Sequence, residues 1–261
     1  MNTPSRLDYA YAVGRVRVLE RYLVAQAVFR EAVEEADFQN AIKTVFDSGR
    51  FRDTMVGIQD SRELDAFLKQ EKENLLSEMR DLFLEKVFLD ILLRMNEPVG
   101  ALALAKVSEC AFIIDYFRHA VDLGNLKIML RLKYAENSKE ELAGRMMEEG
   151  FLDSRMLVEA FDLSYAEIGE KLYASPYRDL WNEAVDKLEE HESFLELERG
   201  IEDFLMRHVQ LARRIFFGPE PVFAYAVAKM REMAHLRILG VGKLNRIPSD
   251  ILKERLGETY V

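Results

Sequence analysis

The chain has 261 residues, of which 49% are hydrophobic, and carries 36 Lys and Arg against 46 Asp and Glu, a net charge of −10. This length allows a sizeable core. The acidic balance argues against nucleic-acid binding by charge alone, because neutralising phosphates needs a basic surface. No apolar run approaches the about 20 residues of a membrane-spanning helix, so we expect any membrane role to be peripheral.

Helical periodicity runs through most of the chain. Apolar residues recur at steps of three and four within 64–83, 126–132 and 194–205. A capping acceptor followed three residues later by a carboxylate predicts helix starts after Asp60, Ser138 and Ser164. Helix-breaking segments lie at Ser48-Gly49, Asn96-Glu97-Pro98, Ser175-Pro176, Gly218-Pro219-Glu220-Pro221 and Ile247-Pro248. No alternating strand pattern persists, so the sequence predicts an all-α protein.

Two segments far apart in the chain nearly repeat. Tyr9–Arg17 (YAYAVGRVR) resembles Phe223–Arg231 (FAYAVAKMR), and Asn125–Lys133 (NLKIMLRLK) aligns with His235–Lys243 (HLRILGVGK). The second alignment has an offset of 110 residues and places Ile113–Val121 opposite Phe223–Arg231. One helical element is therefore expected to begin near residues 9, 113 and 223, as in an array of repeated units. Such units usually build binding surfaces rather than catalytic pockets.

A second repeated element supports this organisation. Asp37–Asp53 resembles Ser164–Asp179, each read as a short helix followed by a breaker, an aromatic residue and Arg-Asp. The chain then divides into helical units at 1–112 and 113–222 and a closing half-unit at 223–261. Small residues along the repeated helix predict close packing, with a large tyrosine beside them: Ala10, Ala12 and Gly14 with Tyr11, and Ala224, Ala226 and Ala228 with Tyr225.

The sequence gives only weak support for a metal site or a phosphate site. Glu232 and His235 have the spacing of one ligand pair in ferritin-like bundles, but those sites need a second pair and two more carboxylates. His191-Glu192 lacks the second histidine of a zinc helix. The run 240–243 (GVGK) has the wrong spacing for a phosphate loop, and its glycines are expected to end a helix. We therefore predict no metal, no cofactor and no catalytic residue; a small helical metallohydrolase stays as a disfavoured alternative.

Several polar residues have two interpretations. Asp122 and Asn125 share a helix face, and we favour a structural polar tie between neighbouring helices, with Glu232 and His235 aligned to them. Lys127 and Arg131 lie four residues apart, so either a partner contact or a solvated charged stripe explains them. Core packing is the favoured role of Cys110, which has no second cysteine and fits a reducing cytosol, and of Trp181, which could otherwise anchor an interface. Leu244 is expected to turn back towards the core after the two glycines.

Four segments together resemble one known family, the C subunit (d in eukaryotes) of V/A-type rotary ATPases and ATP synthases. They are Tyr11-x-x-x-Arg15-x-Arg17-x-x-Glu20, Asp122-x-x-Asn125-Leu126-Lys127-x-x-x-Arg131, Ser175-Pro176-Tyr177, and the closing stretch from Pro221 through Leu236-Arg237-Ile238-Leu239 and Gly242-Lys243-Leu244 to Tyr260-Val261. Family members usually show three full circuits, whereas two and a closing half are recognisable here.

The resemblance implies a helical, funnel-like socket with pseudo-symmetry around an axis. It implies a non-catalytic central-stalk subunit, peripheral on the cytoplasmic face of the membrane, that couples the rotor shaft to the proteolipid rotor ring. Membrane contact would be indirect, through the ring. We expect the polar contacts with partners to come from Lys127, Arg131, Arg237 and Lys243. The alternative is a free-standing α-solenoid adaptor with unrelated protein partners.

Overall fold

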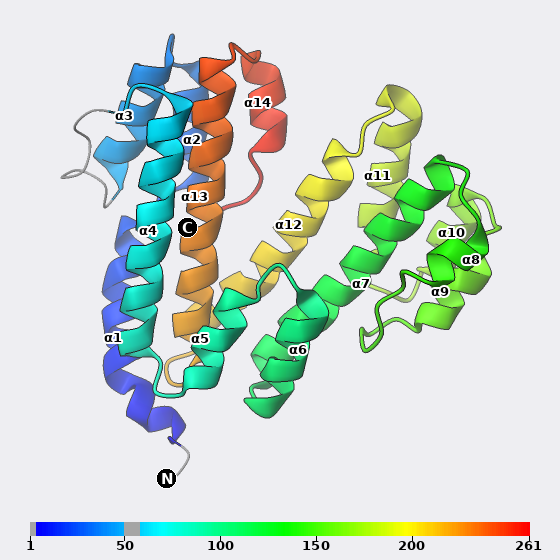
Figure 1. Cartoon of the computed structure of the whole chain (residues 1–261), viewed down its shortest axis with the longest axis horizontal. Coiled ribbons are helices and arrows are strands. Elements are labelled where there is room, and N and C mark those ends of the chain that lie inside the picture. Colours follow the sequence, from blue (N-terminus) through cyan, green and yellow to red (C-terminus); the bar gives the residue numbers. More distant parts are fainter. Residues whose placement is uncertain (1–3, 50–57) are drawn as a thin grey trace. The chain divides into compact units, whose positions relative to one another are not determined.

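The computed structural model describes residues 4–49 and 58–261, and within these ranges it contains helices and no strand (Figure 1). The predicted all-α class is confirmed. The α-helices are α1 (Ala10–Leu19), α2 (Gln26–Glu34), α3 (Phe38–Ser48), α4 (Ser61–Leu82), α5 (Lys86–Leu93), α6 (Pro98–Val107), α7 (Ala111–Tyr134), α8 (Lys139–Ala143), α9 (Ser154–Ala160), α10 (Tyr165–Lys171), α11 (Arg178–His191), α12 (Leu195–Gln210), α13 (Glu220–Leu244) and α14 (Ser249–Arg255). Short 3-10 turns lie at Arg6–Tyr9, Glu20–Tyr22 and Leu211–Arg214.

The predicted helix starts are confirmed. Asp60 accepts a hydrogen bond from the Glu63 N–H at 2.8 Å at the start of α4. Ser138 and Ser164 cap α8 and α10 in the same way. Each cap satisfies one of the backbone donors that a helix start leaves without an intrahelical partner.

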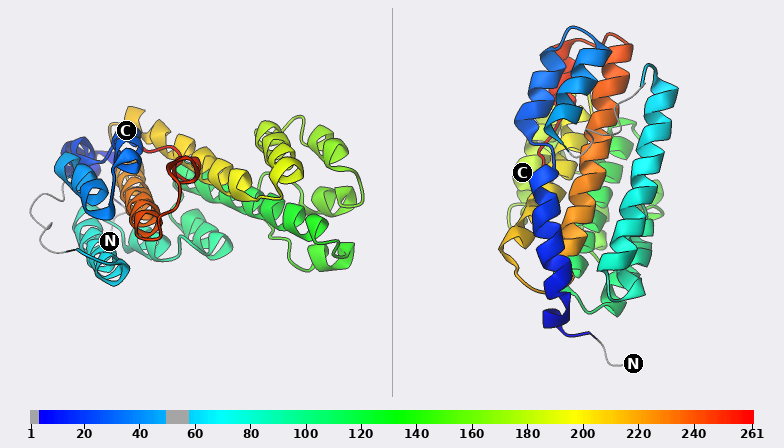
Figure 2. Two further views of the ribbon diagram at one scale, coloured as in Figure 1. Left: turned by 90° about the horizontal axis from the view of Figure 1, so that it is seen from above. Right: turned by 90° about the vertical axis from the view of Figure 1, so that its left-hand side faces the viewer.

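The chain forms two compact units. Unit 1 contains Met1–Leu92 and Met206–Val261, so residues near both ends belong to it, and unit 2 contains Leu93–Leu205. In unit 1, α13 packs against α1, α2, α3 and α4, and Figures 1 and 2 show it running among them. In unit 2, α6 packs on α7 and α10 packs on α11. The boundaries of these units differ from the repeat boundaries that the sequence predicts after residues 112 and 222. The repeat boundaries stay a prediction.

The 110-residue offset is visible in the backbone of the two longest helices. We call residues related by this offset counterparts. α7 and α13 end at the counterparts Tyr134 and Leu244. Each then has a left-handed residue, Glu136 or Arg246, with φ of 55°, and α8 and α14 begin at counterparts as well. The N–H of Asn137 bonds the Leu132 carbonyl at 2.9 Å, as Ile247 bonds Gly242. The same helix–cap–helix unit thus occurs twice.

The first repeated segment differs from the other two. α1 has only 10 residues, and Tyr11 is 79% exposed, whereas Tyr225 is 2% exposed. Ala10 and Gly14 are exposed too, so the prediction of close packing is wrong for these residues of α1. It is right for Ala224, Ala226 and Ala228, which are buried. The predicted similarity of Asp37–Asp53 to Ser164–Asp179 can be followed only to residue 49, because residues 50–53 lie outside the described ranges.

The glycines near the end of α13 also behave differently from the expectation. The helix continues through Gly240 and Gly242 to Leu244, so they do not end it. A Cβ at 240 would lie 2.3 Å from Leu64, and one at 242 would lie 2.2 Å from Leu252. A larger residue at either position would force Leu64 of α4 or Leu252 of α14 to shift, because both leucines pack closely against α13 there.

Candidate functional site

The residues singled out in the sequence lie on α7 and α13 at counterpart positions. Asp122 and Glu232 are one pair, and Asn125 and His235 are another. All four side chains are buried, at 0–3% exposure. Each pair can therefore be compared directly, one member in each unit.

Asp122 fastens a loop to α7. Its carboxylate accepts hydrogen bonds from the N–H groups of Phe151 at 2.9 Å and Leu152 at 3.1 Å, and from the Tyr177 hydroxyl at 2.8 Å. Burial raises the pKa of Asp122, while these hydrogen bonds act to lower it. The Tyr177 hydroxyl lies also 2.6 Å from the His119 ring, so a polar network joins α7 to the start of α11.

Asn125 holds the same loop one turn further along α7. Its amide oxygen accepts from the Met147 N–H and its amide nitrogen donates to the Met147 carbonyl, both at 2.8 Å. The two side chains together fix the loop that precedes α9, satisfying backbone groups that would otherwise lack partners.

In unit 1, Glu232 makes the corresponding contact, but His235 does not. Glu232 accepts from the Val24 N–H at 2.6 Å and pairs with the buried Lys229 ammonium. Burial raises the pKa of Glu232. Neither ring nitrogen of His235 has a hydrogen-bond partner among the described residues. The ring packs edge-on against Phe29 at 5.3 Å, and burial lowers the pKa of His235 to about 3.

A second pair of counterparts, Lys133 and Lys243, holds the ends of short helices. The Lys243 ammonium donates to the carbonyls of Val33 and Glu35, the latter at 2.6 Å, where α2 ends. Lys133 donates to the Phe161 carbonyl at 2.8 Å, where α9 ends. Cations suit helix C-termini because the last carbonyls lack partners there. Lys243, expected at a partner interface, is thus engaged inside unit 1. Sequence reasoning missed Lys133, although the 110-residue offset pairs it with Lys243.

The other predicted contact residues lie on partly exposed faces. Lys127 and Arg131 both pair with Glu198 of α12, at 3.0 and 2.5 Å. Arg237, the counterpart of Lys127, pairs with Asp65 of α4 at 3.0 Å. The side chains of these three cations are 36%, 48% and 63% exposed. Exposed ion pairs contribute little to stability, so these groups can exchange their carboxylate partners at low cost.

Residues 4–49 and 58–261 hold neither a metal-binding cluster nor a membrane-spanning helix. No group of three or more His, Cys, Asp or Glu side chains in these ranges is placed to hold a metal ion. None of the helices there is long and apolar enough to cross a membrane. Trp181 is fully buried, and its indole N–H donates to the Tyr165 carbonyl at 3.0 Å.

Comparison with known proteins gives the family. The family model described as ATP synthase (C/AC39) subunit matches residues 100–255, which include both long helices and the elements between them. The chain belongs to this family. The resemblance found in the sequence is therefore confirmed.

Relatives of this C/AC39 chain are C subunits of a V-type sodium ATPase and of A-type ATP synthases. It is 26% identical over 180 residues to the C subunit of the V-type sodium ATPase of Enterococcus hirae, covering 69% of this chain and 52% of that protein. It is 25% identical over 185 residues to the C subunit of the A-type ATP synthase of Methanobrevibacter smithii, covering 69% and 46%. The chain thus spans about half the length of the relatives it matches.

Proposed function

We propose that the chain is a non-catalytic central-stalk subunit of a V/A-type ion-translocating rotary ATPase or ATP synthase. It couples the rotor shaft to the proteolipid ring, at the cytoplasmic face of the membrane and without inserting into it. The observation that carries this proposal is the family match over 100–255. The names of the relatives, C subunits of a V-type sodium ATPase and of an A-type ATP synthase, support it.

The construction of the two units suits a part that transmits force. The buried ties at Asp122, Asn125 and Glu232 fix loops and short helices to a long helix. Close-packed helices transmit strain rather than absorb it. Torque can then pass through each unit with little deformation, and no bond is made or broken in this chain.

Lys127, Arg131 and Arg237 are the proposed polar contacts with the shaft or the ring. Their side chains are partly exposed, and their present partners are single carboxylates on a neighbouring helix. Lys243 is the least favoured of the four cations expected to contact partners, because its ammonium already donates to two backbone carbonyls.

Affinity purification of the tagged chain from its native membranes tests the proposal. Shaft and ring subunits should copurify with the wild-type chain, and less of them with a Lys127→Glu/Arg237→Glu double variant. A Lys187→Glu variant, which reverses an exposed charge on α11, serves as the matched control and should behave as wild type. Recovery with unrelated proteins and no rotary subunits would establish the adaptor alternative instead.

A further inference from the structure

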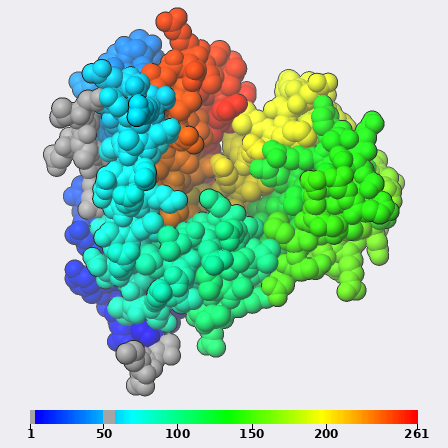
Figure 3. All heavy atoms as spheres, in the orientation of Figure 1, coloured from blue at the N-terminus to red at the C-terminus, as the bar shows by residue number. Residues whose placement is uncertain are grey.

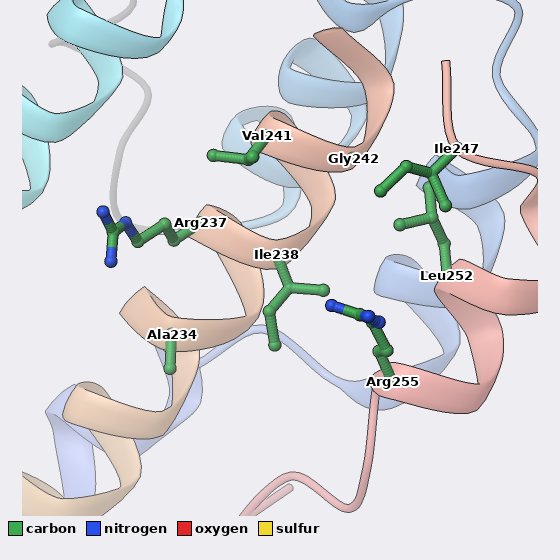
Figure 4. A pocket seen from close by; sticks show the side chains of 8 residues that line it. All are labelled: Ala234, Arg237, Ile238, Val241, Gly242, Ile247, Leu252 and Arg255. Carbon is green, nitrogen blue, oxygen red and sulfur yellow. The ribbon is translucent and has the colours of Figure 1, made fainter. Parts of the chain in front are cut away.

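A shallow apolar hollow lies between α13 and α14 in unit 1. Its volume is about 360 Å³. Figure 4 shows the side chains that line it, and in Figure 3 part of α13 is visible at the surface between α4 and α14. The lining residues are Ala234, Arg237, Ile238, Val241, Gly242, Ile247, Leu252 and Arg255. The floor is aliphatic, and two arginines flank it.

The counterpart surface in unit 2 is covered by the chain itself. Gly124 is the counterpart of Ala234, and the Met147 methyl group lies 2.5 Å from where a Cβ at Gly124 would be. Ile128, the counterpart of Ile238, packs against the core of unit 2, as does Met146. The segment that covers this surface follows α8 and is the loop held by Asn125.

Unit 1 lacks this cover for a reason visible in the sequence. The counterparts of Met146 and Met147 are Leu256 and Gly257. Leu256 is buried, and Gly257 has no side chain with which to cover Ala234. His235, the counterpart of Asn125, makes no side-chain hydrogen bond among the described residues, so the clamp on this segment is absent too.

The charges at the hollow favour an acidic occupant. Arg255 has no ion-pair partner within the described ranges, and Arg237 pairs only with an exposed carboxylate of Asp65. In the unit 2 segment Glu148 and Glu149 follow the two methionines directly, and there they contact Ser154 and Lys106 rather than the counterparts of the two arginines. An unbranched apolar side chain fills irregular space well, and neighbouring carboxylates complement the two arginines.

We propose that this hollow binds a segment of a partner protein that presents a methionine side chain directly beside carboxylates. The inference does not depend on the rotary role, because it comes from comparing two units of one chain. It adds an apolar contact to the charged contacts proposed above. This contact is the hollow between α13 and α14, which is lined by aliphatic side chains and flanked by two arginines.

The probe for this site is a capped peptide with the sequence of residues 144–152 (GRMMEEGFL), added to the 261-residue chain. Methyl NMR of isotope-labelled isoleucines reports the binding position. The methyl signals of Ile238 and Ile247, which line the hollow, should shift with peptide concentration. Those of Ile251, exposed on α14 but outside the hollow, should not and serve as the internal control.

Variants of both components sharpen this test. A peptide with both glutamates changed to lysine should bind about fivefold more weakly, and Arg255→Glu in the protein should restore its affinity. Ala234→Phe fills the hollow and should abolish the shifts. Because that variant could disturb α13, the exposed Arg255→Glu keeps the test decisive.

Three results would overturn the proposal. The first is the absence of methyl shifts throughout the titration of the wild-type chain. The second is binding that Arg255→Glu and the lysine peptide leave unchanged. The third is a concentration-dependent dimer of the chain alone with the same shifts at Ile238, which would make the occupant a second copy. None of these results would affect the purification experiment that tests the rotary role.

Discussion

Asp122 on α7 and Glu232 on α13 make the same contact in the two units. Each carboxylate accepts a hydrogen bond from a backbone N–H two residues before a short helix: Leu152 before α9, and Val24 before α2. In unit 2 the short helix comes later in the chain than the long helix, whereas in unit 1 it comes earlier, with Val24 208 residues before Glu232. The same packing arrangement is thus achieved with two different chain connections.

Asp122→Ala should destabilise the chain strongly. It leaves the N–H groups of Phe151 and Leu152 and the Tyr177 hydroxyl without their acceptor, and we expect a loss of about 3 kcal/mol in the free energy of unfolding. Urea denaturation measures this loss. Asp186→Ala, which removes an exposed carboxylate from α11, is the control and should change stability by less than about 0.5 kcal/mol. Equal losses in the two variants would contradict the structural role of Asp122.

His235 should make unit 1 sensitive to acid. Its folded-state pKa of about 3 lies below the value of about 6.5 in an unfolded chain. The stabilisation from a neutral histidine is therefore complete above pH 6.5 and is lost as the pH falls towards 3. Between pH 7 and 5, the protonation of His235 in the unfolded chain alone should lower the free energy of unfolding by about 2 kcal/mol. Because His235→Leu lacks this titrating group, its free energy of unfolding should fall by about 2 kcal/mol less than that of the wild type between pH 7 and 5. Urea denaturation at both pH values measures the difference.

The same variant tests the environment of His235 at neutral pH. Both ring nitrogens lack partners among the described residues, so an apolar side chain of similar size removes buried polar groups at little cost. His235→Leu should thus match or exceed wild-type stability at pH 7. A loss above about 2 kcal/mol would show that the ring has a polar partner in solution.

Lys133→Met and Lys243→Met should have similar effects, because both remove a cation from the end of a short helix. We expect each to lower the free energy of unfolding by about 1–2 kcal/mol. Lys187→Met on α11 should have little effect, since it breaks only an exposed ion pair. If Lys243→Met left stability intact but reduced the recovery of rotary subunits, Lys243 would be a partner contact after all.

Gly240→Ala and Gly14→Ala should change stability in opposite directions. A Cβ at 240 would meet Leu64 at 2.3 Å, whereas one at 14 meets nothing within 4 Å. We expect a loss of about 1–3 kcal/mol at 240 from overpacking and a gain of about 0.5–1 kcal/mol at 14 from helix propensity. Thermal unfolding of the two variants distinguishes these outcomes. A gain at both positions would contradict the close approach of α4 to α13.

Sequence patterns predicted the features that depend on local chemistry. The caps at Asp60, Ser138 and Ser164 need only residues within one turn. The repeats located helix starts near residues 9, 113 and 223, where α1, α7 and α13 begin. The spacing of three residues predicted that Asp122 and Asn125 share one face of α7.

Features that depend on distant neighbours were not predictable in this way. Tyr11 and Tyr225 lie in nearly identical segments, yet their exposures are opposite, because the surroundings of α1 and α13 differ. Gly240 and Gly242 looked like a helix end, because the sequence does not reveal that Leu64 and Leu252 approach them. Lys243 looked like a surface cation, because the carbonyls that it caps lie more than 200 residues away.

The membership of α13 in unit 1 has a consequence for biosynthesis. During translation α1 to α4 leave the ribosome long before α13, the helix on which they pack. Unit 2 is continuous in the chain, so all of its residues have been synthesised before α13 exists. We therefore expect unit 2 to fold first on the nascent chain, while the apolar faces of α2, α3 and α4 wait for their partner and are the natural targets of chaperones.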